Sequence, residues 1–222
     1  MKKLLLIALI AVMAPSVMAV PAIQLYINSP DASYDATTQT WVVNANEFEL
    51  WVITANTDSK PIYDLTLVAA FGGEEATPPS GSLSATDVNS SIPLSQGPMS
   101  WGTPPLEGSD AGDYPGHGIY PTWYTEMYIS ALVDDYSETV EDMQPGETGT
   151  AKGKIFKYLI SSDYEYVHFD AYGYHRESDG HFKFVPPSHD AEHCGEPIPE
   201  PATLLLLGIG LAASGAIKRK MS

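Results

Sequence analysis

The sequence predicts an all-β protein: an antiparallel β-sandwich with one long Gly/Pro-rich loop, flanked by a signal peptide and a C-terminal transmembrane helix. Three observations support this class. Apolar and polar residues alternate with a period of two through the central segments, which is typical of half-buried strands. Turn-forming residues separate these segments, and no long amphipathic helical pattern interrupts them. Uncharged apolar runs of helical character occur near the two ends of the chain.

We expect four parts along the chain. In order they are a signal peptide (1–19), an exported β-sandwich domain (20–192), a linker (193–198) and a sorting tail (199–222), whose transmembrane helix covers residues 202–217. The exported part is long enough to form one domain with a substantial core.

The N-terminus has the pattern of a secretory signal peptide. Lys2 and Lys3 precede an apolar run over residues 4–12, and Ala19 ends a stretch of small residues that suits a signal peptidase. The run is too short to span a bilayer, which disfavours an uncleaved anchor. We therefore expect signal peptidase to cleave after Ala19, so that the mature protein begins at Val20.

The predicted strands follow in order. Their alternating segments are residues 23–27, 48–52, 63–71, 156–160 and 167–171. In the second of these, Phe48, Leu50 and Val52 share one face while Glu49 lies on the other, so the strand has a core side and a solvent side. Asn, Asp, Ser and Pro between the segments supply turns. This pattern favours two antiparallel sheets packed face to face.

One long stretch does not follow this alternation. Residues 72–118 are rich in Gly, Pro and Ser and contain few apolar runs. A loop of this length in a compact domain is uncommon and is usually functional or mobile. We expect short strands at residues 82–83 and 91–94 to interrupt it.

The C-terminal tail combines a rigid motif, an apolar helix and a basic end. The motif consists of Pro199, Glu200 and Pro201, and its two prolines fix φ and remove amide donors, which keeps the segment extended. As a helix, the uncharged run of residues 202–217 is about 24 Å long, slightly short for a bilayer core of about 30 Å. The three cations that should hold its end on the cytoplasmic side are Lys218, Arg219 and Lys220. They disfavour the alternative, a buried helix that ends a soluble domain.

The tail resembles the PEP-CTERM sorting signal of Gram-negative bacteria, because all three parts occur in this order over residues 199–220. The resemblance implies recognition by an exosortase, a membrane cysteine transpeptidase, for which the Pro-Glu-Pro motif is part of the substrate. It implies export across the inner membrane, a transient single-pass state, and a final location at the cell surface or outside the cell. Such proteins are associated with exopolysaccharide and biofilm.

Four central segments resemble a second family, the exported domain called choice-of-anchor N. They are residues 48–71, 117–126, 167–173 and 188–191. This resemblance covers most of residues 20–192 and implies no known reaction. It implies an independent module whose anchor can vary.

The composition excludes nucleic acid as a partner. The chain has 28 Asp and Glu against 11 Lys and Arg, a formal net charge of −17, and several of the cations lie in the two signals. Nucleic acid phosphates require cations, which the exported part lacks. An acidic domain is compatible with calcium, or with keeping its distance from anionic polymers. Cys194 is the single cysteine, so we expect a free or intermolecular thiol there in preference to a catalytic one.

The densest aromatic cluster follows the long loop. It contains Tyr120, Trp123 and Tyr124. Flat rings on a loop can stack against the face of a pyranose, so we predict that these residues contact a glycan. The alternative is a hydrophobic corner that pins the loop.

A second candidate site lies on the predicted strand around His168. Tyr166, His168 and Asp170 point the same way on a strand. Histidine with carboxylates can bind zinc, and a His–Asp pair can act as a base and its orienting group. The candidate metal ligands are His168, Asp170, His189 and Asp190. No HExxH, GxSxG or CxxC motif accompanies them, and a network of surface hydrogen bonds is the alternative.

Scattered acidic residues form a third candidate, for calcium. They are Asp31, Asp35, Asp110, Asp113, Asp134, Asp135, Glu141 and Asp142. Calcium takes about six to eight oxygen ligands at close range. No EF-hand spacing is present, so we expect most of these residues to be solvated charges, and calcium is the one cofactor left open.

Two functions follow from the sequence. The first is a non-enzymatic binding or structural protein that an exosortase sorts to the cell surface or matrix among exopolysaccharides. The alternative is a secreted hydrolase of extracellular polysaccharide, which would use carboxylates or the face that carries His168 and Asp170. A glycosidase needs two carboxylates about 5 to 10 Å apart across a cleft. We favour the first function because no catalytic motif stands out.

Overall fold

The computed structural model describes residues 20–57, 59–104, 119–174, 182–186 and 189–194. These residues are all-β, with strands in two sheets and no helix among them, which confirms the predicted fold class. The predicted signal peptide (1–19), the Pro-Glu-Pro motif and the helix at 202–217 lie outside the described residues. Within the described part of the chain, no helix is long and apolar enough to span a membrane.

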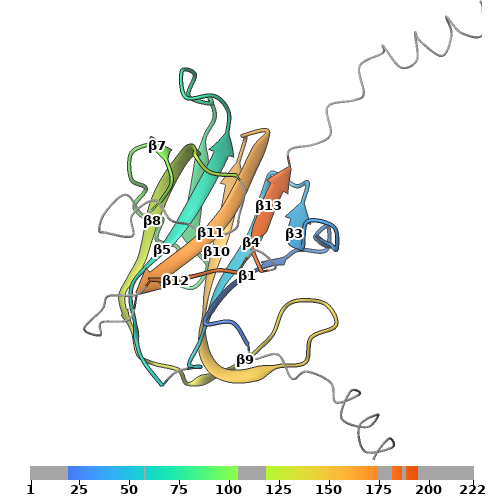
Figure 1. Cartoon of the computed structure of the whole chain (residues 1–222), viewed down its shortest axis with the longest axis vertical. Coiled ribbons are helices and arrows are strands. Elements are labelled where there is room, and N and C mark those ends of the chain that lie inside the picture. Colours follow the sequence, from blue (N-terminus) through green and yellow to red (C-terminus); the bar gives the residue numbers. More distant parts are fainter. Residues whose placement is uncertain (1–19, 58, 105–118, 175–181, 187–188, 195–222) are drawn as a thin grey trace, which may run out of the picture.

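The smaller sheet contains five strands in an antiparallel arrangement. They are β1 (Ile23–Asn28), β4 (Glu47–Ala55), β6 (Leu83–Asp87), β9 (Glu138–Glu141) and β10 (Thr150–Ser162). The order across the sheet is β1-β4-β10-β6, and β9 pairs with the beginning of β10. Strand β10 is therefore the centre of this sheet, paired with three neighbours along its length (Figure 1).

The larger sheet contains eight strands. They are β2 (Ser33–Asp35), β3 (Thr40–Val43), β5 (Ile62–Gly72), β7 (Ser100–Gly102), β8 (Thr122–Val133), β11 (Tyr166–Tyr174), β12 (Phe182–Phe184) and β13 (Ala191–Cys194). The order is β2-β3-β13-β11-β5-β8-β7, with β12 beside β11. The pairs are antiparallel except for β13 with β3, which is parallel.

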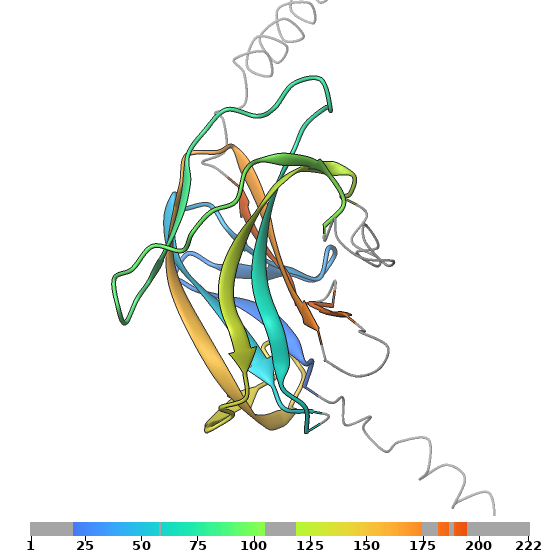
Figure 2. The same cartoon turned by 90° about the vertical axis from the view of Figure 1, so that its left-hand side faces the viewer.

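The core lies between the two sheets. Figure 2 shows the two layers facing each other, with β10 (gold) in one and β5 and β8 (teal and yellow-green) in the other. Strands such as β1, β4 and β11 contribute every second side chain, as the alternation predicts. The fully buried core residues include Ile23, Leu25, Leu50, Val52, Leu65, Leu67, Ile160, Val167, Phe169 and Ala171. A sandwich follows because each sheet has an apolar face that only the other sheet can cover.

The long Gly/Pro-rich stretch is more ordered than predicted. Strand β6 begins at Leu83, within the short strand expected at 82–83, and continues to Asp87. The segment expected at 91–94 forms a bridge between Thr86 and Pro93, supported by a hydrogen bond from Leu94 N to the Ala85 carbonyl at 2.8 Å. Strand β7 was not predicted. Residues 105–118 lie outside the described part.

The domain extends two residues beyond the predicted boundary at 192. Strand β13 runs to Cys194, so the first two residues of the predicted linker belong to the sheet. The reason is burial, because the His193 ring is fully buried and stacks on Phe48 at 5.7 Å. Burial, and the negative charge of Glu192, raise the pKa of the partly buried Cys194 thiol. A raised pKa leaves little thiolate at neutral pH, which agrees with a thiol that is not catalytic.

Candidate functional site

The predicted polar face of β11 lies on the outer side of the larger sheet. Val167, Phe169 and Ala171 point into the core, so His168 and Asp170 point away from it, as the sequence predicted. Their neighbours on β5 have short side chains. Ala70 pairs with His168, and Val68 pairs with Asp170. These short side chains leave room above the sheet for the polar groups.

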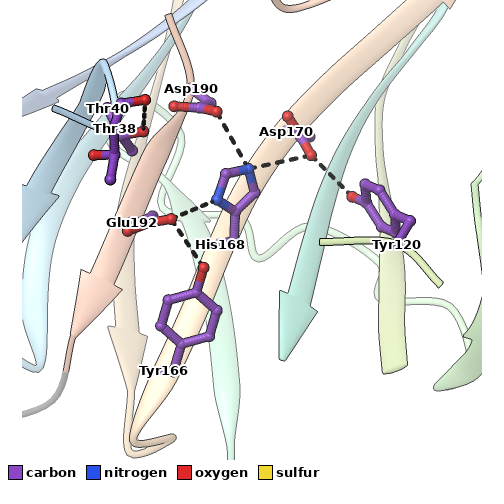
Figure 3. A network of polar contacts seen from close by, with 8 residues as sticks. All are labelled: Thr38, Thr40, Tyr120, Tyr166, His168, Asp170, Asp190 and Glu192. Carbon is purple, nitrogen blue, oxygen red and sulfur yellow. Dashed lines mark hydrogen bonds and ion pairs between the residues drawn. The ribbon is translucent and has the colours of Figure 1, made fainter. Parts of the chain in front are cut away.

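His168 is the centre of a network of carboxylates (Figure 3). Its Nδ1 lies 3.0 Å from the Glu192 Oε1 on the neighbouring strand β13. Its Nε2 lies 3.4 Å from Asp170 Oδ2 and 3.5 Å from Asp190 Oδ2. The imidazole is therefore flanked by three acids from two adjacent strands and from the residue just before β13.

Two tyrosines complete the network at its edges. The Tyr166 hydroxyl donates to Glu192 Oε1 at 2.9 Å, and the Tyr120 hydroxyl donates to Asp170 Oδ2 at 2.9 Å. Tyr120 comes from the chain that precedes β8, so the network links segments far apart in the sequence (Figure 3). Each hydroxyl fixes one carboxylate, which restricts how the acids can turn around His168.

The network is buried, which corrects the alternative of ordinary surface hydrogen bonds. His168 is 2% exposed, Asp170 0% and Asp190 3%. Burial by itself disfavours the imidazolium, but Asp170, Glu192 and Asp190 together raise the pKa of His168 to about 10. Burial acts against the Glu192 carboxylate too, but its hydrogen bond to His168 holds the pKa of Glu192 below its usual value.

Of the four predicted metal candidates, three come together and one does not. Within the described part of the chain, ligand atoms of His168, Asp170 and Asp190 all lie within 4.8 Å of one another. His189 points elsewhere, because its Nε2 lies 2.9 Å from Asp142 Oδ1. Sequence reasoning missed Glu192, whose only signal was its place two residues from Asp190 at the predicted end of the domain.

The aromatic residues predicted to contact a glycan do not form an exposed surface together, which corrects that expectation. Tyr124 is 1% exposed and packs with Val68 and Ala70 in a small cluster on the outer face of the larger sheet. Tyr120 packs against the same cluster, and burial raises its pKa well above the usual value. Trp123 is partly buried, and its Nε1 donates to the Glu74 carbonyl at 2.9 Å. The arrangement fits the alternative of a hydrophobic corner.

Four other aromatic side chains form a continuous row of contacts from one sheet to the other. We call it the aromatic array, and its rings are Tyr34, Trp41, Tyr26 and Trp51. Successive ring centroids are 5.5, 4.8 and 5.4 Å apart, and all four side chains are partly exposed. Tyr26 and Trp51 are opposite each other on β1 and β4, on the side away from the core. The array could not be predicted because its members lie on four strands of two different sheets, and the local pattern does not report how those strands pack.

Polar groups surround the aromatic array. The Lys157 ammonium lies 4.4 Å from the centre of the Trp51 ring and pairs with Trp51 across β10 and β4. Glu49 accepts hydrogen bonds from the Trp51 indole and from the Asn28 amide. Flat apolar rings beside fixed donors and acceptors are the features of a binding surface for an amphipathic ligand.

The acidic residues considered for calcium lie in separate places. Asp35 accepts a hydrogen bond from the Thr37 amide at 2.7 Å within its own turn, and Asp135 pairs with Lys154 at 3.4 Å. Glu141 and Asp142 line a shallow hollow beside the turn at residues 147–150. Asp110 and Asp113 lie outside the described part. Calcium binding by this set stays a prediction.

Comparison with known proteins identifies the tail. Residues 197–220 match the model of the PEP-CTERM protein-sorting motif. The chain is therefore an exported protein that an exosortase sorts, with a C-terminal tail that holds it in the membrane transiently. The resemblance of the central segments to choice-of-anchor N stays a prediction.

Similarity to solved structures is distant, and no curated protein matches the chain. One similar structure is described as AvmM, which catalyses macrocyclization in alchivemycin A biosynthesis. It is 9% identical, with a TM-score of 0.38 over 84% of this chain and 96% of that one. Another is a DUF4466 family protein from Parabacteroides merdae, 13% identical, with a TM-score of 0.26 over 78% of this chain and 45% of that one. Similarities at this level carry no argument about activity.

Proposed function

Because the chain carries an exosortase sorting motif, we propose that its domain is a non-enzymatic binding module for exopolysaccharide, acting at the cell surface or in the biofilm matrix. We propose further that the aromatic array is its contact surface. The sorting motif at residues 197–220 supports the first part, because it implies export across the inner membrane, which a protein that binds exopolysaccharide requires.

The single observation that carries the contact surface is the geometry of the aromatic array. Its rings are fixed by strands of both sheets, and their edge-to-face contacts hold each ring in place. A preorganised ring loses little conformational freedom when it binds, so its apolar face contributes to affinity at low entropic cost. The face of a pyranose is apolar and its rim is polar, which complements Trp51 with Lys157 and Glu49 beside it.

The charge of the chain narrows the class of polysaccharide. A net charge of −17 repels anionic polymers over distances of about a Debye length, roughly 10 Å at moderate salt. A neutral or amino-substituted exopolysaccharide meets no such barrier. We therefore infer that the ligand is a polysaccharide without a high density of carboxylates or sulfates.

Truncating the aromatic array should weaken binding. For Trp51→Ala and for Trp41→Ala we expect about a tenfold loss of affinity each, the usual effect of removing one aromatic contact residue. The measurement is co-sedimentation of the purified full chain in detergent with neutral exopolysaccharide from the producing cells.

The matched control is Tyr128→Ala, since Tyr128 is 47% exposed on the larger sheet and lies outside the array. It should bind like the wild type. Unchanged binding by both tryptophan variants, with melting temperatures close to that of the wild type, would show that the array is structural. Release of reducing sugar ends by the wild-type protein would instead support the alternative, a secreted hydrolase.

A further inference from the structure

We propose that the buried group on the outer face of the larger sheet binds a divalent metal ion of the zinc class, through His168 Nε2 and one carboxylate oxygen each of Asp170 and Asp190. These three ligand atoms come from β11 and from the residue that leads into β13, and they all lie within 4.8 Å of one another. The inference is independent of the proposed binding of exopolysaccharide.

The distances between these atoms suit a shared ion. His168 Nε2 lies 3.4 Å from Asp170 Oδ2 and 3.5 Å from Asp190 Oδ2. Both separations exceed the usual range of about 2.7–3.2 Å for an N–H···O hydrogen bond. Two ligands bound at about 2.0–2.1 Å to a tetrahedral ion are about 3.3 Å apart. Both carboxylates therefore already stand close to the spacing from His168 Nε2 that zinc requires, and all three ligand atoms lie within 4.8 Å of one another.

The opposite nitrogen of the same ring has the partner that metal-binding histidines use. His168 Nδ1 lies 3.0 Å from Glu192, and Glu192 is itself held by the Tyr166 hydroxyl at 2.9 Å. An Nδ1–H donated to a carboxylate leaves the Nε2 lone pair directed at the metal position and makes that nitrogen a stronger ligand. The Tyr120 hydroxyl in turn orients Asp170, because it donates a hydrogen bond to that carboxylate at 2.9 Å.

The charges at the site favour a divalent ion. Asp170, Asp190 and Glu192 all approach the same imidazole. Buried carboxylates are stabilised by a cation that contacts them directly. A divalent ion bound to two of the three would offset their mutual repulsion.

The donor set selects the class of ion. One imidazole and two carboxylates form a mixed nitrogen and oxygen set that suits zinc or a similar first-row ion. Calcium prefers about six to eight oxygens, and three buried donors that include a ring nitrogen do not supply them. The ion would join β11 to the start of β13, so its role on this chain is to hold β13 in its inner position in the larger sheet.

The direct test measures zinc on the full chain, purified without a histidine tag, stripped with chelator and dialysed against zinc chloride. We expect one zinc per chain by mass spectrometry of the metal content, and a higher melting temperature in zinc than in calcium. The proposal would be overturned if the wild-type protein retained no zinc, or if calcium raised its melting temperature as much as zinc does.

Variants then locate the ion. His168→Gln and Asp190→Asn should lose the stoichiometric zinc, and Glu192→Gln should weaken zinc binding about 10- to 100-fold through loss of the ring's orientation. His189→Gln is the control, because His189 contacts Asp142 and lies outside the group, and it should bind zinc like the wild type. If His168→Gln is unfolded, Glu192→Gln decides the question. Unchanged zinc affinity in folded Glu192→Gln, or loss of zinc in folded His189→Gln, would contradict the assigned site.

Discussion

In cells that contain the exosortase, we expect the Glu200→Ala variant to stay full length in the membrane fraction and the wild-type domain to be released without its tail. Glu200 is the only charged residue between Pro197 and Ile217. The two flanking prolines fix φ and lack amide donors, which favours the binding of this segment by a processing enzyme. A carboxylate at this place is the group that a cationic enzyme site can select through charge-assisted hydrogen bonds. Alanine removes it and leaves export and folding unchanged.

The measurement is fractionation of the cells, followed by immunoblotting for the domain. Glu196→Ala makes the same change just before the matched motif, which begins at residue 197, and should be released like the wild type. Neutralising the last three cations should give a different defect, in which the helix slips through and full-length protein leaves the membrane. If the wild type and the Glu200→Ala variant both remain full length in the membrane fraction, the motif is only a linker.

The Gly153→Ala substitution is expected to destabilise the domain strongly. Gly153 lies on β10, where it pairs with Ala55 on β4 and Glu138 on β9. A Cβ at this position would overlap the carbonyl oxygen of Thr54 and lie 2.6 Å from a methyl carbon of Val140. The oxygen belongs to the backbone of the sheet, so it cannot move without breaking the pairing. We expect a cost of about 3 kcal/mol or more, a large part of a typical stability of about 5–15 kcal/mol.

Thermal unfolding of the purified full chain, followed by circular dichroism, tests this expectation. Gly146→Ala is the matched control, because no atom lies within 4 Å of its added Cβ. Its φ of 96° still disfavours alanine, so we expect a smaller loss of about 1–2 kcal/mol. A Gly153→Ala protein that melts at the wild-type temperature would contradict the close strand approach at this position.

The faces of the strands could be predicted from the sequence because a strand's side-chain period is local. The alternation around Val167 and Phe169 was enough to place both in the core and to place His168 and Asp170 together on the other face. Whether that outer face is exposed is a different question. The exposure of this face depends on the segment around Tyr120 and on the residues that lead into β13, because both lie over it. No short-range sequence pattern predicts where these two segments lie.

The pairings that bring distant residues together could not be predicted. Glu192 meets His168 because β13 lies beside β11, and Asp142 meets His189 from a separate strand end. The aromatic array likewise needs β1 and β4 of one sheet beside β2 and β3 of the other. The aromatic residues at 120–124 lie close together in the sequence, so they were the clearer candidate for a binding surface. In the structure they cover the outer face of the larger sheet instead.

The parallel strand β13 has a consequence for the timing of export. It is inserted between β3 and β11, both of which precede it in the chain, so the larger sheet cannot close until Cys194 has crossed the membrane. Residues 195–198 alone separate Cys194 from the Pro-Glu-Pro motif, a reach of at most about 18 Å for an extended chain. A domain whose sheet has closed therefore lies within this distance of any enzyme that binds the motif, so we expect the folded domain to limit the approach of that enzyme.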